Sequence, residues 1–363
     1  LVPYIKASEE LKTKPTQHSV MRLREIGLSP DIILCRSEYR LDRSTRNKIA
    51  LFCNVAPDHV IEGTEVKSIY KVPLVFHQQK VGNLIADRLQ LTGLPQVEEL
   101  SYFMERYRKP ATKVTIAMCG KYTELPDAYK SVMESFIHAG VENNCRVELK
   151  WIKTSQIASD EDARDQFEDV NGILILPGFG SRGTEGKILA SKFARENLVP
   201  FLGICLGLQC AVIDFARHVC GLADANSSEF DPGTRYPVID LMESQRAIKA
   251  KGGTMRLGAY DCQIIAGTKA YRAYRTHKIS ERHRHRWEVN NRYRQRLEKN
   301  GLVVSGTNPE LKLVEIIEIP DHPWFVAGQF HPELKSRINR AHPLFRDFVA
   351  HAVIHQQEST GEA

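Results

Sequence analysis

The chain has 363 residues, of which 42% are hydrophobic and 26% are charged, and 50 basic against 44 acidic residues give a formal net charge of +6. This length is long for one hydrophobic core, so two domains are expected. The composition is that of an ordinary globular protein, and no apolar stretch approaches the roughly 20 residues that would cross a bilayer. The mildly basic balance suits anionic small molecules such as nucleotides as well as it suits nucleic acid.

Residues 1–103 are expected to form a partial α/β domain. Short apolar runs predict strands over Asp31–Cys35 and Lys48–Cys53, and helical spacing predicts a helix from Lys71 to Leu91. Residues 104–112 are charged and contain a proline, which predicts an exposed connector between two domains.

A second domain is expected over residues 113–355, followed by a polar tail over residues 356–363. Buried strands are predicted at 114–119, 146–152, 173–176 and 201–204, and helices at 127–139 and 211–218. Strands that alternate with helices predict an α/β fold with an open, mostly parallel sheet covered on both faces.

The 8 cysteines are scattered, and none forms a C-x-x-C pair or a short spacing typical of zinc sites. We therefore expect no metal site. A chain of this length does not need disulfide bonds, so reduced thiols and a cytoplasmic location are expected.

A cysteine flanked by two glycines is the strongest local motif. Gly203-Ile-Cys205-Leu-Gly207 follows an apolar run and precedes a helical pattern. Glycines two positions either side of a nucleophile permit the sharp strand-to-helix turn of G-x-S-x-G hydrolases. The helix N-terminus would favour the thiolate of Cys205, and the Leu206 N–H would be one oxyanion donor. The alternative is that Cys205 is an ordinary buried thiol at a strand end.

A histidine and a carboxylate occur together far downstream, in Gln329-Phe-His331-Pro-Glu333. Residues two apart point to the same side of an extended segment, so Glu333 is expected beside the His331 ring. A base that is oriented by a carboxylate and directed at a thiol is the arrangement that nucleophilic catalysis requires.

The segments GICLGLQ and QFHPE resemble the class I glutamine amidotransferases. The resemblance assigns a catalytic triad to Cys205, His331 and Glu333. It implies attack by Cys205 on the carboxamide of glutamine, release of ammonia and hydrolysis of a glutamyl thioester. It also assigns the binding of glutamine to three residues, which are Gln209, Glu229 and Arg286.

Other segments resemble the CTP synthase family, and they occur in the right order along nearly the whole chain. They span residues 12–19, 48–55, 120–130, 182–187, 225–230, 253–258 and 281–290. The resemblance implies ATP-dependent amination of UTP to CTP with ammonia from glutamine. It also implies ATP and Mg²⁺ as cofactors, GTP as an allosteric activator, CTP as a feedback inhibitor and a homotetramer.

The same resemblance assigns nucleotide-binding residues. They are Lys12, Thr13, Lys14, Gln17 and Lys48 for UTP and CTP, Arg36 for ATP, and Arg182, Gly183 and Glu185 for GTP. Ammonium groups are compact phosphate binders, which fits the lysines. By composition alone, the segment KTKPTQH would be a solvated turn, and a glycine-rich loop is weak evidence.

Arginine and histidine alternate over residues 282–286. In an extended strand, Arg284 and Arg286 share one face with Arg282, while His283 and His285 share the other. The arginines make a metal site unfavourable, because they would repel the ion. The family resemblance assigns Arg286 to the glutamine α-carboxylate, which a guanidinium group can bind through two hydrogen bonds. We expect neither a nucleic-acid partner nor a membrane partner.

One departure from the family pattern lies at Leu176–Gly180, which reads L-P-G-F-G where P-G-G-F-G is usual. In ungapped register, Pro177 replaces a glycine whose N–H binds the oxyanion, and proline has no N–H. Losing such a donor costs about 3–4 kcal/mol, or about 100- to 1,000-fold in rate. A shift by one residue would give the role to Gly178, which is the arrangement we expect.

A second departure concerns the synthetase chemistry. We find neither a Gly-rich phosphate loop ending in Lys nor a carboxylate set for Mg²⁺. The chain opens in mid-pattern without an initiator Met, so we expect a missing upstream segment and, in the chain as given, glutaminase chemistry only. Two alternatives stay open: a non-catalytic assembly or regulatory paralogue, which Pro177 favours, and a stand-alone γ-glutamyl hydrolase, against which KTKPTQH argues.

Overall fold

The computed structural model describes residues 1–93, 96–121, 126–241 and 255–361. The chain divides into two compact units, Leu1–Glu105 and Arg106–Ala363. Parts of two segments quoted above, residues 122–125 and residues 253–254, lie outside the described residues, as does the end of the predicted tail. No helix in the described ranges is long and apolar enough to cross a membrane.

The first unit is a small α/β body. Its elements are β1 (Tyr4–Ile5), β2 (Glu10–Leu11), α1 (Lys14–Glu25), β3 (Ile33–Ser37), α2 (Arg43–Cys53), β4 (Val60–Thr64), α3 (Val72–Gln78), α4 (Val81–Leu89) and α5 (Glu98–Arg108). Strands β3 and β4 pair in parallel, and β1 and β2 form a hairpin. A small core that includes Val2, Ile33, Ile49 and Val60 joins the strands to α1 and α2.

Two predictions for this unit were wrong in detail. The predicted strand Lys48–Cys53 is instead the last part of helix α2. This helix begins after Asp42, and the Asp42 carboxylate caps it by accepting a hydrogen bond from the Thr45 N–H at 2.9 Å. The single helix predicted from Lys71 to Leu91 is two helices, because Lys80 has a left-handed backbone conformation with φ of 57° between α3 and α4.

The second unit is built around one large sheet. Among the described residues, 9 strands lie in the order β12-β11-β14-β15-β16-β8-β7-β5-β6. Their bounds are β5 Thr112–Gly120, β6 Cys145–Lys153, β7 Gly172–Ile175, β8 Phe201–Ile204, β11 Arg256–Ile264, β12 Lys278–His285, β14 Val303–Thr307, β15 Val314–Glu318 and β16 Phe325–Gly328. Neighbours from β16 to β6 are parallel, and those from β12 to β16 are antiparallel.

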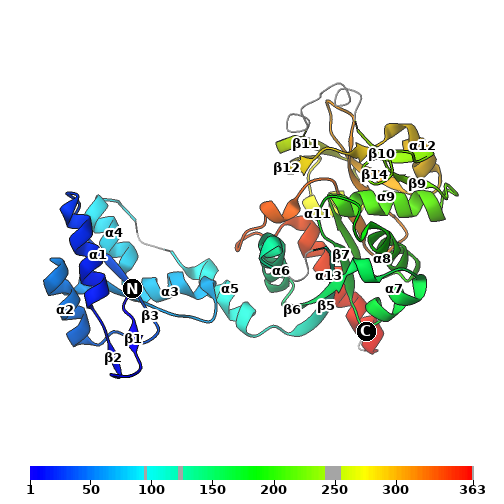
Figure 1. Ribbon diagram of the computed structural model, residues 1–363. Coiled ribbons are helices and arrows are strands. Elements are labelled where there is room, and N and C mark those ends of the chain that lie inside the picture. The colour runs from blue at the N-terminus through cyan, green and yellow to red at the C-terminus, as the bar shows by residue number, and fades with distance from the viewer. Residues whose placement is uncertain (94–95, 122–125, 242–254, 362–363) are drawn as a thin grey trace. The chain divides into compact units, whose positions relative to one another are not determined.

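Helices cover both faces of this sheet (Figure 1). One face carries α7 (Asp160–Phe167), α8 (Thr184–Glu196) and α9 (Leu206–His218), and the other carries α6 (Lys130–Glu142), α11 (Lys269–Tyr274) and α13 (Pro343–Thr360). Among the described residues, this unit also contains helix α12 (Asn291–Lys299). Strands β9 (Ala225–Ser227), β10 (Tyr236–Asp240) and β13 (Glu288–Val289) form a small second sheet.

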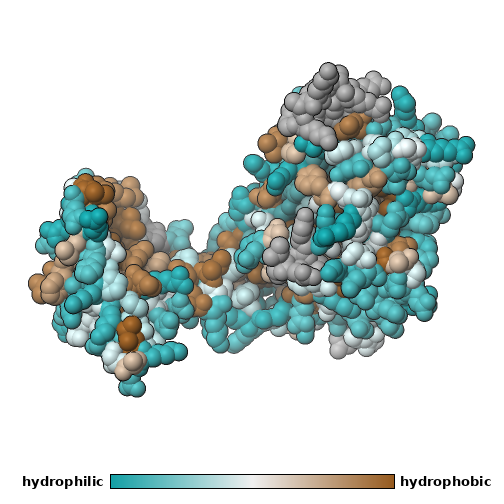
Figure 2. Space-filling model, in the orientation of Figure 1, coloured by the Kyte–Doolittle hydropathy of each residue, from teal (hydrophilic) through white to brown (hydrophobic). Residues whose placement is uncertain are grey.

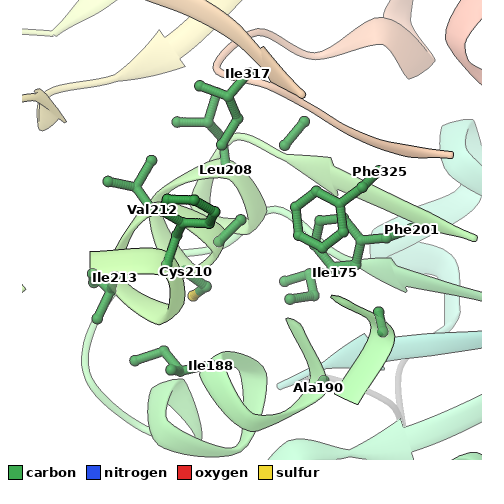
Figure 3. Close-up of a cluster of buried hydrophobic side chains, with 14 of the residues drawn as sticks. Ile175, Ile188, Ala190, Phe201, Leu208, Cys210, Val212, Ile213, Ile317 and Phe325 are labelled. Carbon is green, nitrogen blue, oxygen red and sulfur yellow. The ribbon is translucent and has the colours of Figure 1, made fainter. Parts of the chain in front are cut away.

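The parallel strands supply both cores because successive side chains point to opposite faces. Phe201 and Leu202 of β8 belong to different core clusters, as do Ile173 and Leu174 of β7. On the α8–α9 face, the Phe201 ring stacks on Phe325 with centroids 4.3 Å apart (Figure 3). These buried, closely packed strands support the end of the sheet where the cysteine motif lies.

The segments between and after the predicted domains are more regular than the prediction had them. In the predicted connector 104–112, α5 continues to Arg108 and β5 begins at Thr112. In the predicted tail, α13 continues to Thr360.

Hydrophobic side chains are exposed on the surface of the first unit, including Leu51 at 78% and Ile69 at 67% (Figure 2).

Candidate active site

Cys205 lies on a sharp turn between β8 and α9. Its backbone has φ of 54° and ψ of −98°, a conformation in which a residue other than glycine is uncommon. The flanking glycines are required by close packing. A Cβ on Gly203 would lie 2.8 Å from the Ala327 Cβ, and one on Gly207 would lie 2.7 Å from the Ile175 carbonyl oxygen. The turn therefore places the thiol at the carboxyl end of the sheet, as the motif predicted.

Strand β16 brings the histidine segment to the same sheet end. It pairs in parallel with β8, and the Cys205 N–H donates to the Gly328 carbonyl at 2.8 Å. His331 Nδ1 and Glu333 Oε1 are 2.7 Å apart, and both side chains are almost fully buried. The segment is not extended as we expected, because Pro332–Leu334 forms a 3-10 turn, and this turn folds the carboxylate back onto the ring.

The electrostatics of His331 link it to both partners. Burial lowers the pKa of its imidazole, but interactions with Cys205 and Glu333 outweigh that effect and raise the pKa to about 10. Since Nδ1 is bound to Glu333, Nε2 is the nitrogen left to interact with the thiol. A protonated imidazole at neutral pH beside a thiol favours a thiolate–imidazolium pair.

A cavity of about 280 Å³ opens at this corner. Cys205, His331 and Glu333 all line it, together with Tyr129 of the loop before α6 and the Pro177–Phe179 segment. Its volume is near the lower end of small-molecule sites, which fits a substrate the size of an amino acid. Arg284 also lines this cavity, as an exposed residue of β12.

The predicted oxyanion residues are neighbours. A Cβ built on Gly178 would lie 3.6 Å from Leu206 Cδ2 and 3.8 Å from Lys187 Nζ. Leu206 is the first residue of α9, where backbone N–H groups have no intrahelical acceptor. Lys187, at 2% exposed, is buried in α8, and burial lowers the pKa of its ammonium group. Gly178 and Pro177 both line the cavity.

The predicted glutamine-binding residues lie around the same loop. Glu229 Oε1 accepts a hydrogen bond from the Gly180 N–H at 3.0 Å. Burial raises the pKa of Glu229, while the Gly180 hydrogen bond and the charge of Arg286 act in the opposite direction. Gln209 is buried and donates to the Trp287 carbonyl at 3.0 Å, so its amide is already bound within the protein.

The predicted GTP residues lie at the start of α8. Arg182 is exposed, and Gly183 has φ of 74° directly before the helix. Glu185 forms an ion pair with Arg217 at 2.6 Å. This carboxylate therefore fixes the start of α8 to α9.

In the first unit, the predicted nucleotide-binding residues differ in exposure. Lys14 and Lys48 are exposed, Lys12 pairs with Glu10, and Gln17 donates to the hydroxyl of buried Thr13 at 3.0 Å. Arg36 pairs with Glu65 at 2.9 Å and lines a cavity of about 520 Å³. The cavity walls are otherwise largely apolar, with Leu34, Val66, Ile69, Val72, Val75 and Phe76.

Residues 124–351, more than half of the chain, match the family model for glutamine amidotransferase class-I. The chain belongs to the class I glutamine amidotransferase family. In this family, the expected α/β fold with an open, helix-covered sheet is confirmed. Residues 1–91 match a second model, described as CTP synthase N-terminus.

Several proteins whose sequences are similar to this chain are CTP synthases. That of Moorella thermoacetica is 53% identical over 97% of this chain, and that of Chlorobium phaeobacteroides is 53% identical over 99%. This chain spans 65% and 64% of those two proteins. The glutaminase domain of Trypanosoma brucei CTPS, solved with bound acivicin, is 35% identical with a TM-score of 0.63, over 66% of this chain and 94% of that one.

Two residues of this amidotransferase site were not assigned a role from the sequence. Arg284 lines the cavity, although Arg286 was the arginine chosen for glutamine. Gln329, fully buried, places its amide 3.8 Å from the Cys205 sulfur. The available signal for Gln329 was its position two residues before His331 in the segment Gln329-Phe-His331-Pro-Glu333.

Proposed function

We propose that residues 106–363 hydrolyse the side-chain amide of glutamine. The observation that carries this proposal is that Cys205 lines one cavity together with His331 and Glu333, which lie far downstream in the chain. A hydrogen-bonded imidazole and carboxylate beside a thiol at a helix N-terminus is a complete set for nucleophilic acyl transfer.

In the proposed reaction, the Cys205 thiolate attacks the carboxamide carbon and forms a tetrahedral intermediate. The backbone N–H groups of Gly178 and Leu206 stabilise the oxyanion, as donors fixed before the reaction. Protonated His331 gives its proton to the departing nitrogen, so ammonia leaves and a thioester remains. His331 then takes a proton from water, the hydroxide attacks the thioester, and glutamate and the thiolate are released.

In this proposal, charged side chains bind the oppositely charged groups of the glutamine substrate. Glu229 would accept the α-ammonium of glutamine, and Arg286 would bind the α-carboxylate. Arg284 supports a variant of this assignment, because it lines the cavity directly. Gln209 would act by shaping the subsite, since its amide donates to the Trp287 carbonyl.

For the whole protein, we propose CTP synthase activity, the ATP-dependent amination of UTP with ammonia from glutamine. The support is the similarity to CTP synthases over nearly the whole chain. Adenine would suit the apolar walls of the 520 Å³ cavity, with Arg36 close to the phosphates. Lys12, Lys14 and Lys48, with Thr13 and Gln17, would bind the UTP phosphates and the overlapping inhibitor CTP.

The further properties proposed with this activity are GTP activation through the loop of Arg182, Gly183 and Glu185, a homotetramer and a cytoplasmic location. Mg²⁺ would accompany ATP. Within the described ranges, no group of three or more His, Cys, Asp or Glu side chains could hold a metal ion. No step through Mg²⁺ is derived.

Glutamate release from glutamine tests the proposal. The purified 363-residue chain with GTP should release glutamate, and Cys205→Ala should reduce the rate at least about 1,000-fold, because the remaining site cannot form a thioester. Cys220→Ser, a change at another buried cysteine, should leave the rate within about twofold. Equal rates for wild type and Cys205→Ala would refute the triad assignment. A folded wild type without any turnover would favour the non-catalytic alternative that Pro177 raises.

A further inference from the structure

The side-chain amide of Gln329 lies within hydrogen-bonding reach of the Cys205 sulfur. Gln329 follows β16 and is fully buried, and its backbone N–H donates to the Glu315 carbonyl at 2.8 Å. Its Nε2 lies 3.8 Å from the Cys205 sulfur, within range for a hydrogen bond to sulfur. The backbone bond therefore fixes the base of a side chain whose tip reaches the nucleophile.

The orientation of this amide is set by its neighbour Gln209. Gln209 Nε2 donates to the Trp287 carbonyl at 3.0 Å and lies 3.5 Å from Gln329 Oε1. A carbonyl oxygen accepts only, so the nitrogen of Gln209 has to face Trp287. Its second N–H then faces the oxygen of Gln329, and the nitrogen of Gln329 is left to face the thiol.

A pair of buried histidines holds the Trp287 carbonyl from the other side. His285 Nδ1 lies 3.2 Å from that carbonyl and has to carry the proton of the bond. Burial, with the charge of Arg256, lowers the pKa of His285 to about 3 and also lowers the pKa of His283, so both rings are neutral at pH 7. His285 Nε2 therefore accepts from His283 Nδ1 at 2.9 Å.

This series of hydrogen bonds ends at His283, whose Nε2 carries no proton when Nδ1 donates. His283 Nε2 lies 3.4 Å from the carboxylate of Glu315, the residue whose carbonyl accepts from Gln329. Glu315 is fixed in turn by Arg256 at 2.7 Å. Reversal of the Gln329 amide would place its nitrogen against the Gln209 nitrogen, and reversal of the Gln209 amide would place its oxygen against the Trp287 carbonyl oxygen; both are costly for buried groups. The contacts of Gln209 with Trp287 and with Gln329 therefore favour one orientation of the Gln329 amide.

We propose that Gln329 is a further residue of the glutaminase reaction, which donates a hydrogen bond to the Cys205 thiolate and holds the sulfur in its attacking position. This inference rests on the proposed glutaminase function. A hydrogen bond to the charged form of a group favours that form, so the amide acts together with the two cations around the thiol. Those cations are the His331 imidazolium, with its partner Glu333, and the buried ammonium of Lys187.

Two substitutions separate the donor from the shape of the side chain. Gln329→Glu keeps the size and the acceptor for Gln209 but replaces the N–H donor by a carboxylate oxygen. Gln329→Met removes donor and acceptor without adding charge. The rate of Cys205 alkylation by iodoacetamide, followed by mass spectrometry from pH 4 to pH 10, reports the thiolate.

The expected result is an upward shift of the alkylation midpoint by about one pH unit in Gln329→Met and by more in Gln329→Glu. The kcat for glutamine should fall about tenfold or more, with KM changed less, because a hydrogen bond to a charged group contributes about 1.5–3 kcal/mol in general. Gln263→Glu, an exposed change in β11 of the same sheet, is the matched control and should have the wild-type midpoint.

A wild-type midpoint in both Gln329 variants would overturn the inference, even if their thermal stability falls, because a purely structural residue would not move it. Absence of turnover in wild type would instead refute the proposed function. If neither variant folds, wild-type protein decides the matter. The side-chain amide nitrogen of Gln329, observed by ¹⁵N NMR, should shift with the alkylation midpoint, and a pH-independent resonance would contradict the proposal.

Discussion

The two units of the chain differ in how far they prepare the side chains assigned to chemistry. In residues 106–363, Cys205, His331 and Glu333 are buried, and His331 is hydrogen-bonded to Glu333 before any substrate is present. In residues 1–105, Lys14 and Lys48 are exposed. The difference is physical: an activated nucleophile needs fixed dipoles and little water, whereas a phosphate can be bound by mobile cations. The glutaminase site should therefore be sensitive to isosteric changes, and the nucleotide residues should not.

The largest effect expected from an isosteric change is at Glu333. Glu333→Gln keeps the shape but removes the charge that orients and stabilises the His331 imidazolium. Glutamate release should fall about 100-fold or more, with little change in KM. Steady-state kinetics measure it, with exposed Glu310→Gln as the control. A loss below about threefold would show that the carboxylate does not support the base.

A smaller effect is expected at the arginines of the RHRHR segment. Arg286→Met should raise the KM for glutamine about tenfold or more by removing a charge partner of the α-carboxylate, with kcat less affected. Arg284→Met, at a residue that lines the cavity, decides between the two candidates. If only Arg284→Met raises KM, the α-carboxylate is bound by Arg284 and the assignment to Arg286 is wrong.

Substitutions of the exposed lysines should have smaller consequences still. Lys14→Met and Lys48→Met should each weaken UTP binding a few-fold, because an exposed ion pair contributes about 1 kcal/mol or less. Glutamate release should stay within about twofold of wild type. Calorimetric titration with UTP and the glutaminase assay measure the two effects, with Lys299→Met in α12 as control. Unchanged UTP binding in both variants would remove these lysines from the nucleotide site.

The pH dependence of stability tests the charge state of the triad with the smallest expected signal. The pKa of His331 is raised from 6.5 to about 10, so its contribution is fully present below pH 6.5 and is lost as pH rises through about 10. The melting temperature of wild type should therefore fall more between pH 7 and pH 10 than that of His331→Gln. Parallel curves for the two proteins would show that His331 is not protonated in the folded state.

Much of the fold around the nucleophile was predictable because local and tertiary signals agree there. Gly203 and Gly207 mark the turn at Cys205, and the apolar runs of β7 and β8 are too short for helices. Where the signals conflict, the prediction failed. The run Lys48–Cys53 is apolar enough for a strand, but the Asp42 cap and the residues after it make it helical. Weighing that cap would have corrected the error.

The parts of the site that the sequence could not predict depend on contacts between distant strands. Exposed and buried side chains alternate along β12, and His283 and His285 lie on its buried face. Their neutral state depends on burial and on Arg256, and their link to Gln329 runs through Glu315 on another strand. The spacing of residues within one segment cannot predict contacts of this kind between separate strands. The position of Gly178 close to the Leu206 side chain likewise depends on segments far apart in the sequence.

The most direct test of the central claim is covalent capture by a glutamine-analogue electrophile. The account predicts one adduct per chain, located at Cys205 by peptide mass spectrometry, formed much more slowly in His331→Gln and prevented by excess glutamine. The other cysteines are buried without such an imidazole partner in the described structure and should stay unmodified. Modification at another cysteine, or a Cys205 adduct that forms at the same rate without His331, would contradict the account.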